Sequence, residues 1–476
     1  MRRIAVIAAG CCLVSAGLGF ATPTSGATDA RRLDATFASG VAMVPLESRQ
    51  EMGLADGTRR STGASVRAAV RSACRSLEHD LGCRLVQRSR HIVGRGVAEY
   101  RYVLRVGPGR HDRIGLHRVV HEARPGVPAS TRSAVMLVHG DVWGFGPLFG
   151  GDLGGPVRAP NVATFLARRH VDVWGVDLRW ARVPSHTDTF SFMRSWGPAV
   201  DVHDVRVATT VERAIREETG SGAGRTALLG YSSGGLIAYA YANYETHLPW
   251  RSRNVDALVP ADTLLRYAPN DDAFRRNQCR TYRESQQALM EGNYEQNLKA
   301  IVRLGQSALA DPSGPSQVIP GFTNRQAALL VGAQTPEFFN RWFHFAAGLF
   351  DADGVPTGLR YTPPARLFGL FQQASPWNPV RELARRSKIW CGKPDALVDN
   401  VDAVHVPVLY LAAAGGFGET GRYSTTLLGS RDVTLRVVGV RSAPQAPMDI
   451  GHVDMWRAGK APRLVWRPLA AWLRAH

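Results

Sequence analysis

The stretch that decides the fold reads Thr226-Ala227-Leu228-Leu229-Gly230-Tyr231-Ser232-Ser233-Gly234-Gly235-Leu236-Ile237-Ala238. Residues 226–229 have the composition of a buried strand, and the apolar residues after Gly235 have the character of a helix. A serine in Gly-x-Ser-x-Gly between strand and helix lies on a sharp turn, which exposes its hydroxyl near a helix N-terminus that favours negative charge. This context predicts a nucleophile at Ser232. A Gly-rich packing turn is the structural alternative.

Short apolar runs and helical segments alternate on both sides of this turn. The apolar runs are residues 134–138, 171–176, 226–229, 257–259, 406–411 and 433–438, and the helix candidates are residues 161–169, 204–218, 233–244 and 461–473. Continuous apolar runs separated by helices are typical of parallel strands covered on both faces. The sequence therefore predicts an α/β fold with a doubly wound, mostly parallel sheet.

The chain divides into a leader, an extension, a core and an insertion. We expect an extension at residues 28–130, with a helix over 64–77 and antiparallel strands at 97–106 and 114–122. The predicted core comprises residues 131–262 and 405–476. Residues 263–404 interrupt the alternation and are rich in aromatic side chains, which predicts an inserted, mainly helical cap. Extra core for one large domain is the alternative.

The first 27 residues have the pattern of a secretory signal peptide. Met1-Arg2-Arg3 precedes an apolar run at residues 4–21 and small residues at 22–27. We expect cleavage near Ala27 and a secreted protein. A membrane anchor is the alternative, although three glycines weaken the apolar run. Lipid attachment at Cys11 is a further alternative, disfavoured by the short apolar segment before it.

Four cysteines follow the predicted signal peptide, an even number in a chain expected to enter an oxidising compartment. Among the three pairings that four cysteines allow, we favour Cys74 with Cys83, which are close in sequence, and Cys279 with Cys391, which would join the ends of the insertion. No CxxC spacing, nucleotide-binding fingerprint or metal-ligand cluster is evident in the sequence, so we predict no cofactor and no metal.

The composition is that of a globular protein with an excess of positive charge. Hydrophobic residues make up 45% of the chain, and the formal net charge is +18. Almost all the positive charge is arginine spread along the chain rather than clustered, which favours a solvated surface and no nucleic-acid partner. A basic patch that contacts a membrane or a polyanion is the alternative.

A serine nucleophile requires N–H donors for the oxyanion that forms when it attacks a carbonyl. The N–H of Ser233, the residue after the nucleophile, is the first candidate. The apolar run at residues 134–138 ends in His139-Gly140-Asp141-Val142, so the N–H of Asp141 or Val142 is the second. We expect His139 to hold this loop rather than to act as a base.

The serine also requires a base, normally a histidine oriented by a carboxylate. His452 lies after the last predicted strand and before the terminal helix, which suits the chain order serine, acid, histidine. The acid stays open. Glu419 is the first carboxylate after the strand at 406–411, and Asp262 follows the preceding strand. Asp449, Asp454 or an absent acid are the remaining alternatives.

The order of a strand ending in His139-Gly140, Gly230-x-Ser232-x-Gly234, an aromatic insertion and Gly451-His452 resembles the α/β-hydrolase superfamily of lipases and esterases. The resemblance covers residues 133–473. The sequence segments 173–179 and 449–452 resemble segments of secreted hydrolases of actinobacterial type. The resemblance implies cleavage of an ester or amide through an acyl-enzyme on Ser232, with His452 as the base.

We therefore expect hydrolysis of a carboxylic ester, with a small-molecule or lipid-like ester as the substrate. The aromatic insertion suggests that the ester carries an apolar group. Acyl transfer by the same residues is one alternative. A non-catalytic binding protein with the same fold is another, because fold alone does not confer function.

Overall fold

The computed structural model describes residues 63–77, 82–155, 157, 159–334 and 339–476. The predicted signal peptide, its cleavage point and Cys11 lie outside the described residues. Among the helices that are described, none is long and apolar enough to cross a membrane.

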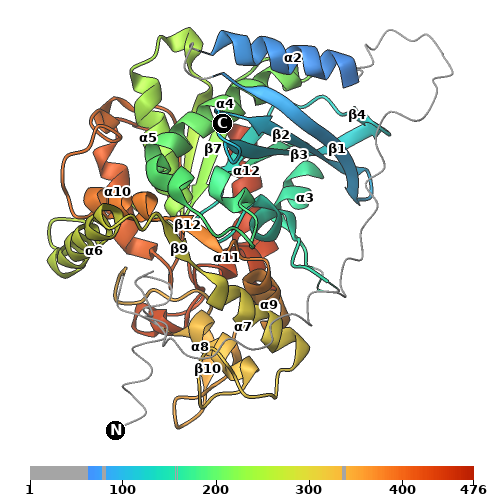
Figure 1. Cartoon of the computed structure of the whole chain (residues 1–476). Helices are drawn as coiled ribbons and strands as arrows, with labels where there is room; N and C mark the ends of the chain where they lie inside the picture. Colours follow the sequence, from blue (N-terminus) through green and yellow to red (C-terminus); the bar gives the residue numbers. More distant parts are fainter. Residues whose placement is uncertain (1–62, 78–81, 156, 158, 335–338) are drawn as a thin grey trace.

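A ten-stranded sheet runs through the centre of the molecule (Figure 1). The strand order is β1-β2-β3-β6-β5-β7-β8-β13-β14, with β4 paired to β3. Strands β6, β5, β7, β8, β13 and β14 are parallel, whereas β1, β2 and β3 are antiparallel and β3 joins β6 in antiparallel pairing. The bounds are β1 (Arg84–Gly94), β2 (Val97–Arg105), β3 (Arg113–Arg124), β4 (Val127–Pro128), β5 (Ala134–Val138), β6 (Asp172–Asp177), β7 (Thr226–Tyr231), β8 (Val255–Ala261), β13 (Val408–Ala413) and β14 (Val433–Val438). The predicted mostly parallel sheet is confirmed.

Helices cover both faces of this sheet because its central strands are apolar on both sides. In β5, Val135 and Leu137 join one apolar cluster while Met136 and Val138 join the other, as the period of two in a strand requires. Helices α3, α11 and α12 pack in the first cluster, and α2, α4 and α5 in the second. The bounds are α2 (Gly63–Ser76), α3 (Val162–Ala167), α4 (Pro198–Glu218), α5 (Ser233–Thr246), α11 (Asp454–Arg457) and α12 (Arg467–Ala475).

The element boundaries follow local sequence signals where such signals exist. Helix α3 begins after Asn161, whose side chain accepts the Thr164 N–H at 2.7 Å as an N-cap. Helix α4 begins at Pro198, earlier than the predicted start at residue 204, because proline suits the first turn of a helix. Strand β1 was not predicted, since its edge position leaves most of its side chains exposed or half-buried and removes the apolar alternation.

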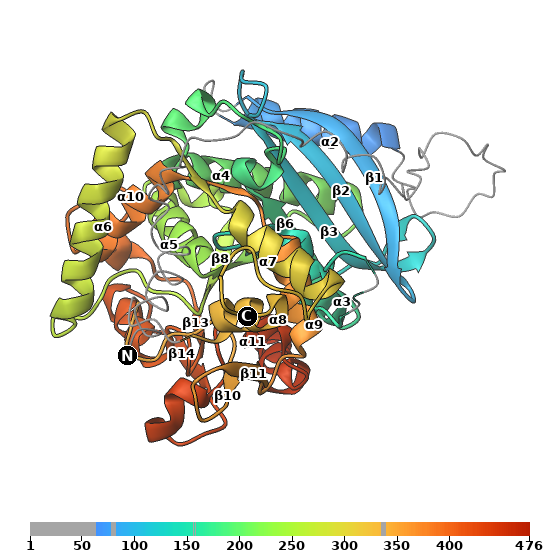
Figure 2. The same ribbon diagram turned by 60° about the horizontal axis from the view of Figure 1, so that its bottom comes forward.

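The segment between β8 and β13 is mainly helical, as predicted. Helices α7, α8 and α9 lie at the bottom of the view in Figure 1, away from α2, whereas α6 and α10 lie at its left-hand side (Figures 1 and 2). Its apolar side chains, such as Leu304 and Phe368, belong to the same cluster as Val135 of the sheet. The segment is therefore continuous with the core, and its action as a cap stays a prediction. Its elements are α6 (Asp272–Met290), β9 (Glu295–Asn297), α7 (Lys299–Ala310), α8 (Asn324–Ala333), β10 (Gly348–Phe350), β11 (Pro356–Leu359), α9 (Pro364–Gln372), β12 (Trp377–Pro379) and α10 (Val380–Trp390).

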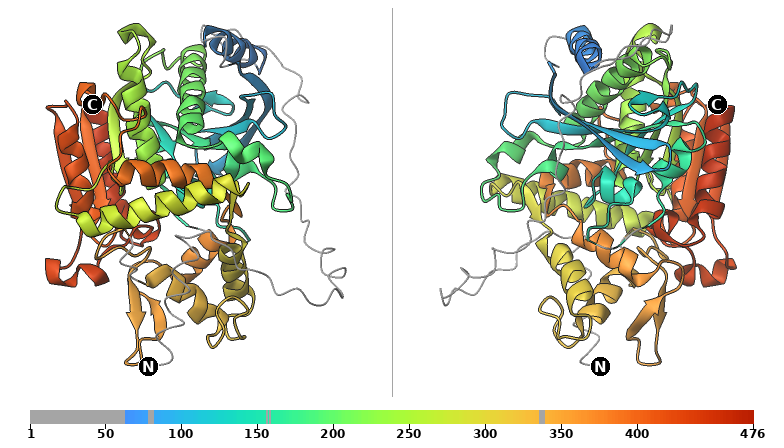
Figure 3. Two further views of the ribbon diagram at one scale, coloured as in Figure 1. Left: turned by 60° about the vertical axis from the view of Figure 1, so that its left-hand side comes forward. Right: turned by 90° about the vertical axis from the view of Figure 1, so that its right-hand side faces the viewer.

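Both favoured disulfide pairings are confirmed. Cys74 and Cys83 are bonded with their Cα atoms 5.0 Å apart, and Cys279 and Cys391 with theirs 4.8 Å apart. The second bond joins α6 to the residue that follows α10, and Figure 3 shows these yellow and orange helices side by side.

Removal of the Cys279–Cys391 bond should destabilise the protein more than removal of the Cys74–Cys83 bond. The two bonds close loops with sequence separations of 112 and 9 residues. The loop-entropy relation makes the longer closure more stabilising by about 2 kcal/mol. Urea unfolding of the two double Cys→Ser variants should show this order in the free energy of unfolding. An equal or reversed order would contradict it.

Candidate active site

Ser232 lies on a strained turn between β7 and α5. Its backbone has φ 59° and ψ −128°, a conformation that residues other than glycine rarely adopt. Neighbouring groups fix it: the Ser232 N–H donates to the Ala261 carbonyl at 3.0 Å, and the Thr263 hydroxyl donates to the Ser232 carbonyl at 2.6 Å. Strain of this kind persists only where the surroundings determine it, and it is concentrated at functional sites.

The two glycines of the motif allow three backbones to approach one another. A Cβ on Gly230 would lie 2.2 Å from the carbonyl oxygen of Gly234. A Cβ on Gly234 would lie 2.3 Å from the carbonyl oxygen of His139. The strand β7, the start of α5 and the loop after β5 therefore meet closely only because these positions lack side chains.

His452 and Asp262 form a buried hydrogen-bonded pair. The His452 Nδ1–H donates to Asp262 Oδ2 across 2.6 Å, and the two side chains are 2% and 0% exposed. Asp262 is the first residue after β8. Its Oδ1 accepts the backbone N–H groups of Ala413 at 3.0 Å and Phe417 at 2.9 Å, so the loop after β13 orients the carboxylate. Because Nδ1 faces Asp262, Nε2 is the ring nitrogen left for a substrate or nucleophile.

The prediction of Glu419 as the partner of His452 is wrong. The Glu419 side chain is 67% exposed and forms an ion pair with Arg422 at 2.5 Å. The loop after β13 directs backbone N–H groups, not this carboxylate, toward the histidine, while the alternative acid, Asp262, fills that position.

The two remaining candidate acids hold backbone rather than the histidine ring. Asp449 accepts the N–H groups of Val440 and Ile450. Asp454 accepts the N–H of Gly451 at 2.8 Å, and the hydroxyl of Thr362 donates to it. Both carboxylates therefore shape the loop that carries His452.

Aromatic rings and a second histidine fix the position of His452. The Tyr231 ring stacks on its imidazole, with centroids 4.4 Å apart and an interplanar angle of 21°. The centroid of the Phe343 ring lies 5.1 Å from the centroid of the His452 imidazole. The backbone N–H of His452 donates to the backbone carbonyl of His344. The side chain of His344 is held in turn by a hydrogen bond between its Nε2 and the carbonyl of Asp449 at 2.8 Å. His344 carried no sequence signal because no motif surrounds it.

The loop after β5 contains Asp141 and Val142, the two candidates for the second oxyanion donor, while Ser233, the first candidate, begins α5. Val142 has φ 76°, a genuine outlier for a β-branched residue. In the part of the chain that the structure describes, its N–H has no backbone acceptor. Ser233 is the first residue of α5, so its N–H has no acceptor within the helix. The side chain of Asp141 accepts the Ser233 hydroxyl at 2.9 Å. The N–H of Asp141 likewise has no backbone acceptor among the described residues, so Asp141 and Val142 both remain candidates for the second donor.

His139 has the structural role that the sequence predicts. It is fully buried; its Nδ1–H donates to the Gly140 carbonyl at 2.9 Å, and its Nε2 accepts the Leu178 N–H at 3.1 Å. Burial lowers the pKa of His139, which keeps the ring neutral. With both nitrogens used, the ring holds the loop and is not free to act as a base.

A second buried network, around Asp177 and His117, anchors the loop after β5. Asp177, the last residue of β6, accepts the Phe145 N–H at 2.8 Å through Oδ1 and contacts His117 at 2.9 Å through Oδ2. His117 also contacts Glu99 at 2.8 Å. Burial alone would lower the pKa of His117, but the charge of Asp177 and hydrogen bonds to both carboxylates raise it from 6.5 to about 9.

This raised pKa predicts a pH-dependent contribution of His117 to stability. The charged imidazole stabilises the folded state fully below pH 6.5, and the contribution is lost as the pH rises through about 9. A His117→Asn variant should therefore be less stable than the wild type near neutral pH, and the gap should narrow at about pH 10. Urea unfolding at both pH values measures this, and a gap that does not narrow would contradict the assignment.

Replacing Gly140 with alanine should impair the site without unfolding the protein. A Cβ there would lie 2.6 Å from the Cβ of Ser232 and 2.9 Å from the Tyr231 carbonyl, so the loop after β5 must shift. Loss of one oxyanion donor costs about 10²- to 10³-fold in kcat. Gly224→Ala, which has nothing within 4 Å of the added Cβ, is the matched control. Equal ester hydrolysis by both variants would contradict the role of this loop.

Ser232 and His452 line one narrow pocket together with Val142. Its volume is about 40 Å³, so a substrate can enter only if lining side chains move. A larger hollow of about 1040 Å³ lies between α2 and α4 and contains none of these residues, so we assign the site by its chemistry rather than by size. Among the described residues, no group of three or more His, Cys, Asp or Glu side chains is arranged to hold a metal ion.

Comparison with known proteins gives a likeness of fold. No protein-family model and no curated protein matches the sequence. Among solved structures, the chain is similar to a protein from Sulfolobus solfataricus whose lipase assignment is itself provisional. The TM-score is 0.56 and the identity 17%, over 83% of this chain and 99% of that one. Together with the sheet order, this likeness shows that the chain has the α/β-hydrolase fold.

A more distant likeness is to a soluble variant of monoglyceride lipase from Saccharomyces cerevisiae. Its TM-score is 0.44 and its identity 12%, over 76% of this chain and 92% of that one. At such identities the likeness concerns the fold alone, and the activity has to be argued from the site.

Proposed function

We propose that the protein is a serine hydrolase that cleaves carboxylic esters through an acyl-enzyme on Ser232. His452 Nε2 takes the proton from the Ser232 hydroxyl as its Oγ attacks the ester carbonyl. The N–H of Ser233 and that of Asp141 or Val142 hold the oxyanion. His452 then gives the proton to the leaving alcohol, and a water activated in the same way releases the acid.

The observation that carries the proposal is the His452–Asp262 pair. The two side chains are joined by a 2.6 Å hydrogen bond and are almost completely buried, and His452 lines the same pocket as Ser232. A carboxylate at Nδ1 selects the tautomer with Nε2 free and stabilises the imidazolium that forms during attack. The provisional lipase assignment of the Sulfolobus protein agrees with this chemistry.

The lining of the pocket supports an ester with an apolar group. Phe343, Phe345 and Leu298 line it beside Tyr231 and Trp143. Apolar walls around a few polar groups are typical of sites that bury hydrocarbon. A small-molecule or lipid-like ester is therefore the proposed substrate.

Secretion is supported by the two disulfides, because such bonds persist in oxidising compartments. The signal peptide that would direct secretion stays a prediction from the sequence.

Hydrolysis of a panel of p-nitrophenyl esters tests the proposal. We expect turnover with release of the free acid, and covalent labelling of the protein by a fluorophosphonate. Product analysis with an added acceptor alcohol separates hydrolysis from acyl transfer, which would give a new ester instead. The alternative of a non-catalytic binding protein rested on the uncertain identity of the acid. The hydrogen bond between Asp262 and His452 weakens that alternative. Absence of both turnover and labelling would overturn the proposal.

A further inference from the structure

One wall of the pocket is polar and comes from the segment between β8 and β13. Gln278 of α6, Asn378 of β12 and Arg386 of α10 all line the pocket that contains Ser232. They are 1%, 2% and 5% exposed. Each has a buried polar atom without a hydrogen-bond partner among the described residues: Nε2 of Gln278, Oδ1 of Asn378 and Nε of Arg386.

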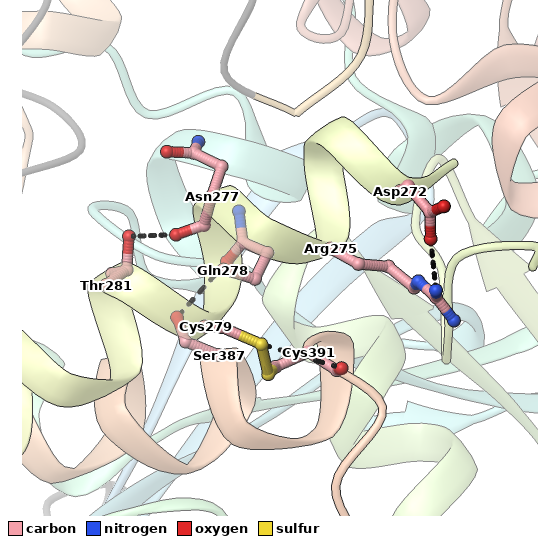
Figure 4. The surroundings of a disulfide bond; sticks show 8 residues. All are labelled: Asp272, Arg275, Asn277, Gln278, Cys279, Thr281, Ser387 and Cys391. Atoms are coloured by element: carbon pink, nitrogen blue, oxygen red, sulfur yellow. Dashed lines mark hydrogen bonds and ion pairs between the residues drawn. A yellow bond between two sulfur atoms is a disulfide. The ribbon is translucent and has the colours of Figure 1, made fainter. Parts of the chain in front are cut away.

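The Gln278 amide is fixed by its surroundings. The Ser387 hydroxyl donates to Gln278 Oε1 at 3.2 Å (Figure 4), and the amide nitrogen Nε2 has no hydrogen-bond partner among the described residues. The next residue, Cys279, is bonded to Cys391, so the disulfide holds α6 against α10 at this level. The amide N–H₂ of Gln278 is therefore a positioned donor.

The Arg386 guanidinium is also fixed, through its Nη1 atom. Its Nη1 donates to Asp141 Oδ2 at 2.6 Å and to Glu382 Oε1 at 2.9 Å. Its Nε–H is left without an acceptor among the described residues. Through Asp141, this guanidinium is tied directly to the loop that carries the two candidates for the second oxyanion donor.

The wall has little net charge. Burial and repulsion from Asp141 raise the pKa of Glu382 well above its ordinary value, which opposes a second negative charge beside Asp141. Burial opposes ionisation of Asp141, but the charge of Arg386 holds its pKa below the ordinary value. The charge of Arg386 is already matched by Asp141 at 2.6 Å, so this wall offers no unpaired cation to an anionic ligand.

We propose that Gln278, Asn378 and Arg386 form a subsite for a neutral, hydroxyl-bearing part of the ester substrate. The wall offers two donors and one acceptor, and a hydroxyl both accepts and donates. Leaving a buried donor or acceptor unpaired is unfavourable, so a ligand that pairs these atoms is favoured over an alkyl group of the same shape. This proposal rests on the proposed function and names the substrate class of that site.

Matched esters test the subsite. Glyceryl butanoate and 2-methylbutyl butanoate have alcohols of the same shape, with hydroxyls in one and methyl groups in the other. Methyl 3,4-dihydroxybutanoate and methyl 3-methylpentanoate make the same comparison on the acyl side. We expect kcat/KM to be at least about tenfold higher for the hydroxylated member of one pair. The 2-carboxyethyl ester of butanoate should be a poorer substrate than the glyceryl ester.

The Gln278→Met variant removes the donor and keeps the length of the side chain. It should abolish the preference for the hydroxylated ester, measured as the ratio of the two kcat/KM values within the pair. Gln287→Met, which changes an exposed glutamine of the same helix, is the control and should retain the preference.

The outcomes separate this proposal from the proposed function. If the protein hydrolyses alkyl esters and reacts with a fluorophosphonate but shows no preference within either pair, the polar atoms serve only to bind water and the subsite is overturned. A preference for the carboxylate ester, or a preference that Gln278→Met leaves intact, also overturns it. If no ester is cleaved and no labelling occurs, the proposed function itself has failed.

Discussion

Replacing Ser232 with alanine is expected to abolish ester hydrolysis and covalent labelling by a fluorophosphonate. The Ser232 hydroxyl is the proposed nucleophile, whereas the neighbouring Ser233 hydroxyl donates to Asp141 at 2.9 Å. Removing a nucleophile of this kind lowers kcat by about 10⁴-fold or more. Initial rates with a p-nitrophenyl ester and in-gel fluorescence of the labelled protein measure the two effects.

The matched control is Ser313→Ala, which changes an exposed serine in a surface turn. It should keep wild-type rates and full labelling. Labelling of Ser232→Ala at the wild-type level would show that another residue is the nucleophile.

Asp262→Asn should produce the second-largest loss, with kcat lower by about 10³- to 10⁴-fold. Asparagine keeps the shape of the side chain but removes the charge that selects the His452 tautomer and stabilises the imidazolium. Because Asp262 Oδ1 also accepts backbone N–H groups from the loop after β13, thermal unfolding of the variant has to be measured beside its rates.

Glu419→Gln is the matched comparison, because this carboxylate was the first choice from the sequence and the structure places it on the surface. It should keep wild-type kcat. If Glu419→Gln lost activity and Asp262→Asn kept it, the assignment of the acid would be reversed.

The turn around Ser232 was predictable because its determinants are local. Gly230, Ser232 and Gly234 lie within five residues between an apolar strand and an apolar helix, and the close approaches of these glycines follow from that short segment. His452 was predictable from its place in the chain order. The cysteine pairs were predictable from proximity in one case and from the ends of the insertion in the other.

The acid was not predictable because its position depends on how two loops meet. Asp262 and Glu419 each follow a strand, and the strands β8 and β13 are neighbours in the sheet. Only the folded loop after β13, which donates the Ala413 and Phe417 N–H groups to Asp262, decides between them.

The polar wall of the pocket carried no sequence signal at all. Gln278, Asn378 and Arg386 belong to three elements, with more than a hundred residues between the first and the last. Polar side chains on helices are usually solvated, so nothing in their spacing indicates burial beside a serine. These side chains are notable because they are buried and each has a polar atom without a hydrogen-bond partner among the described residues. Only the tertiary structure shows both properties.

Mapping the fluorophosphonate adduct by mass spectrometry tests whether Ser232 is the nucleophile. Trypsin should release residues 226–251 as one peptide, since Arg225 and Arg251 flank a stretch free of lysine and arginine. We predict one adduct per molecule on this peptide, with fragment ions that place it on Ser232 rather than Ser233. An adduct on any other residue, or none on a folded protein, would contradict the account.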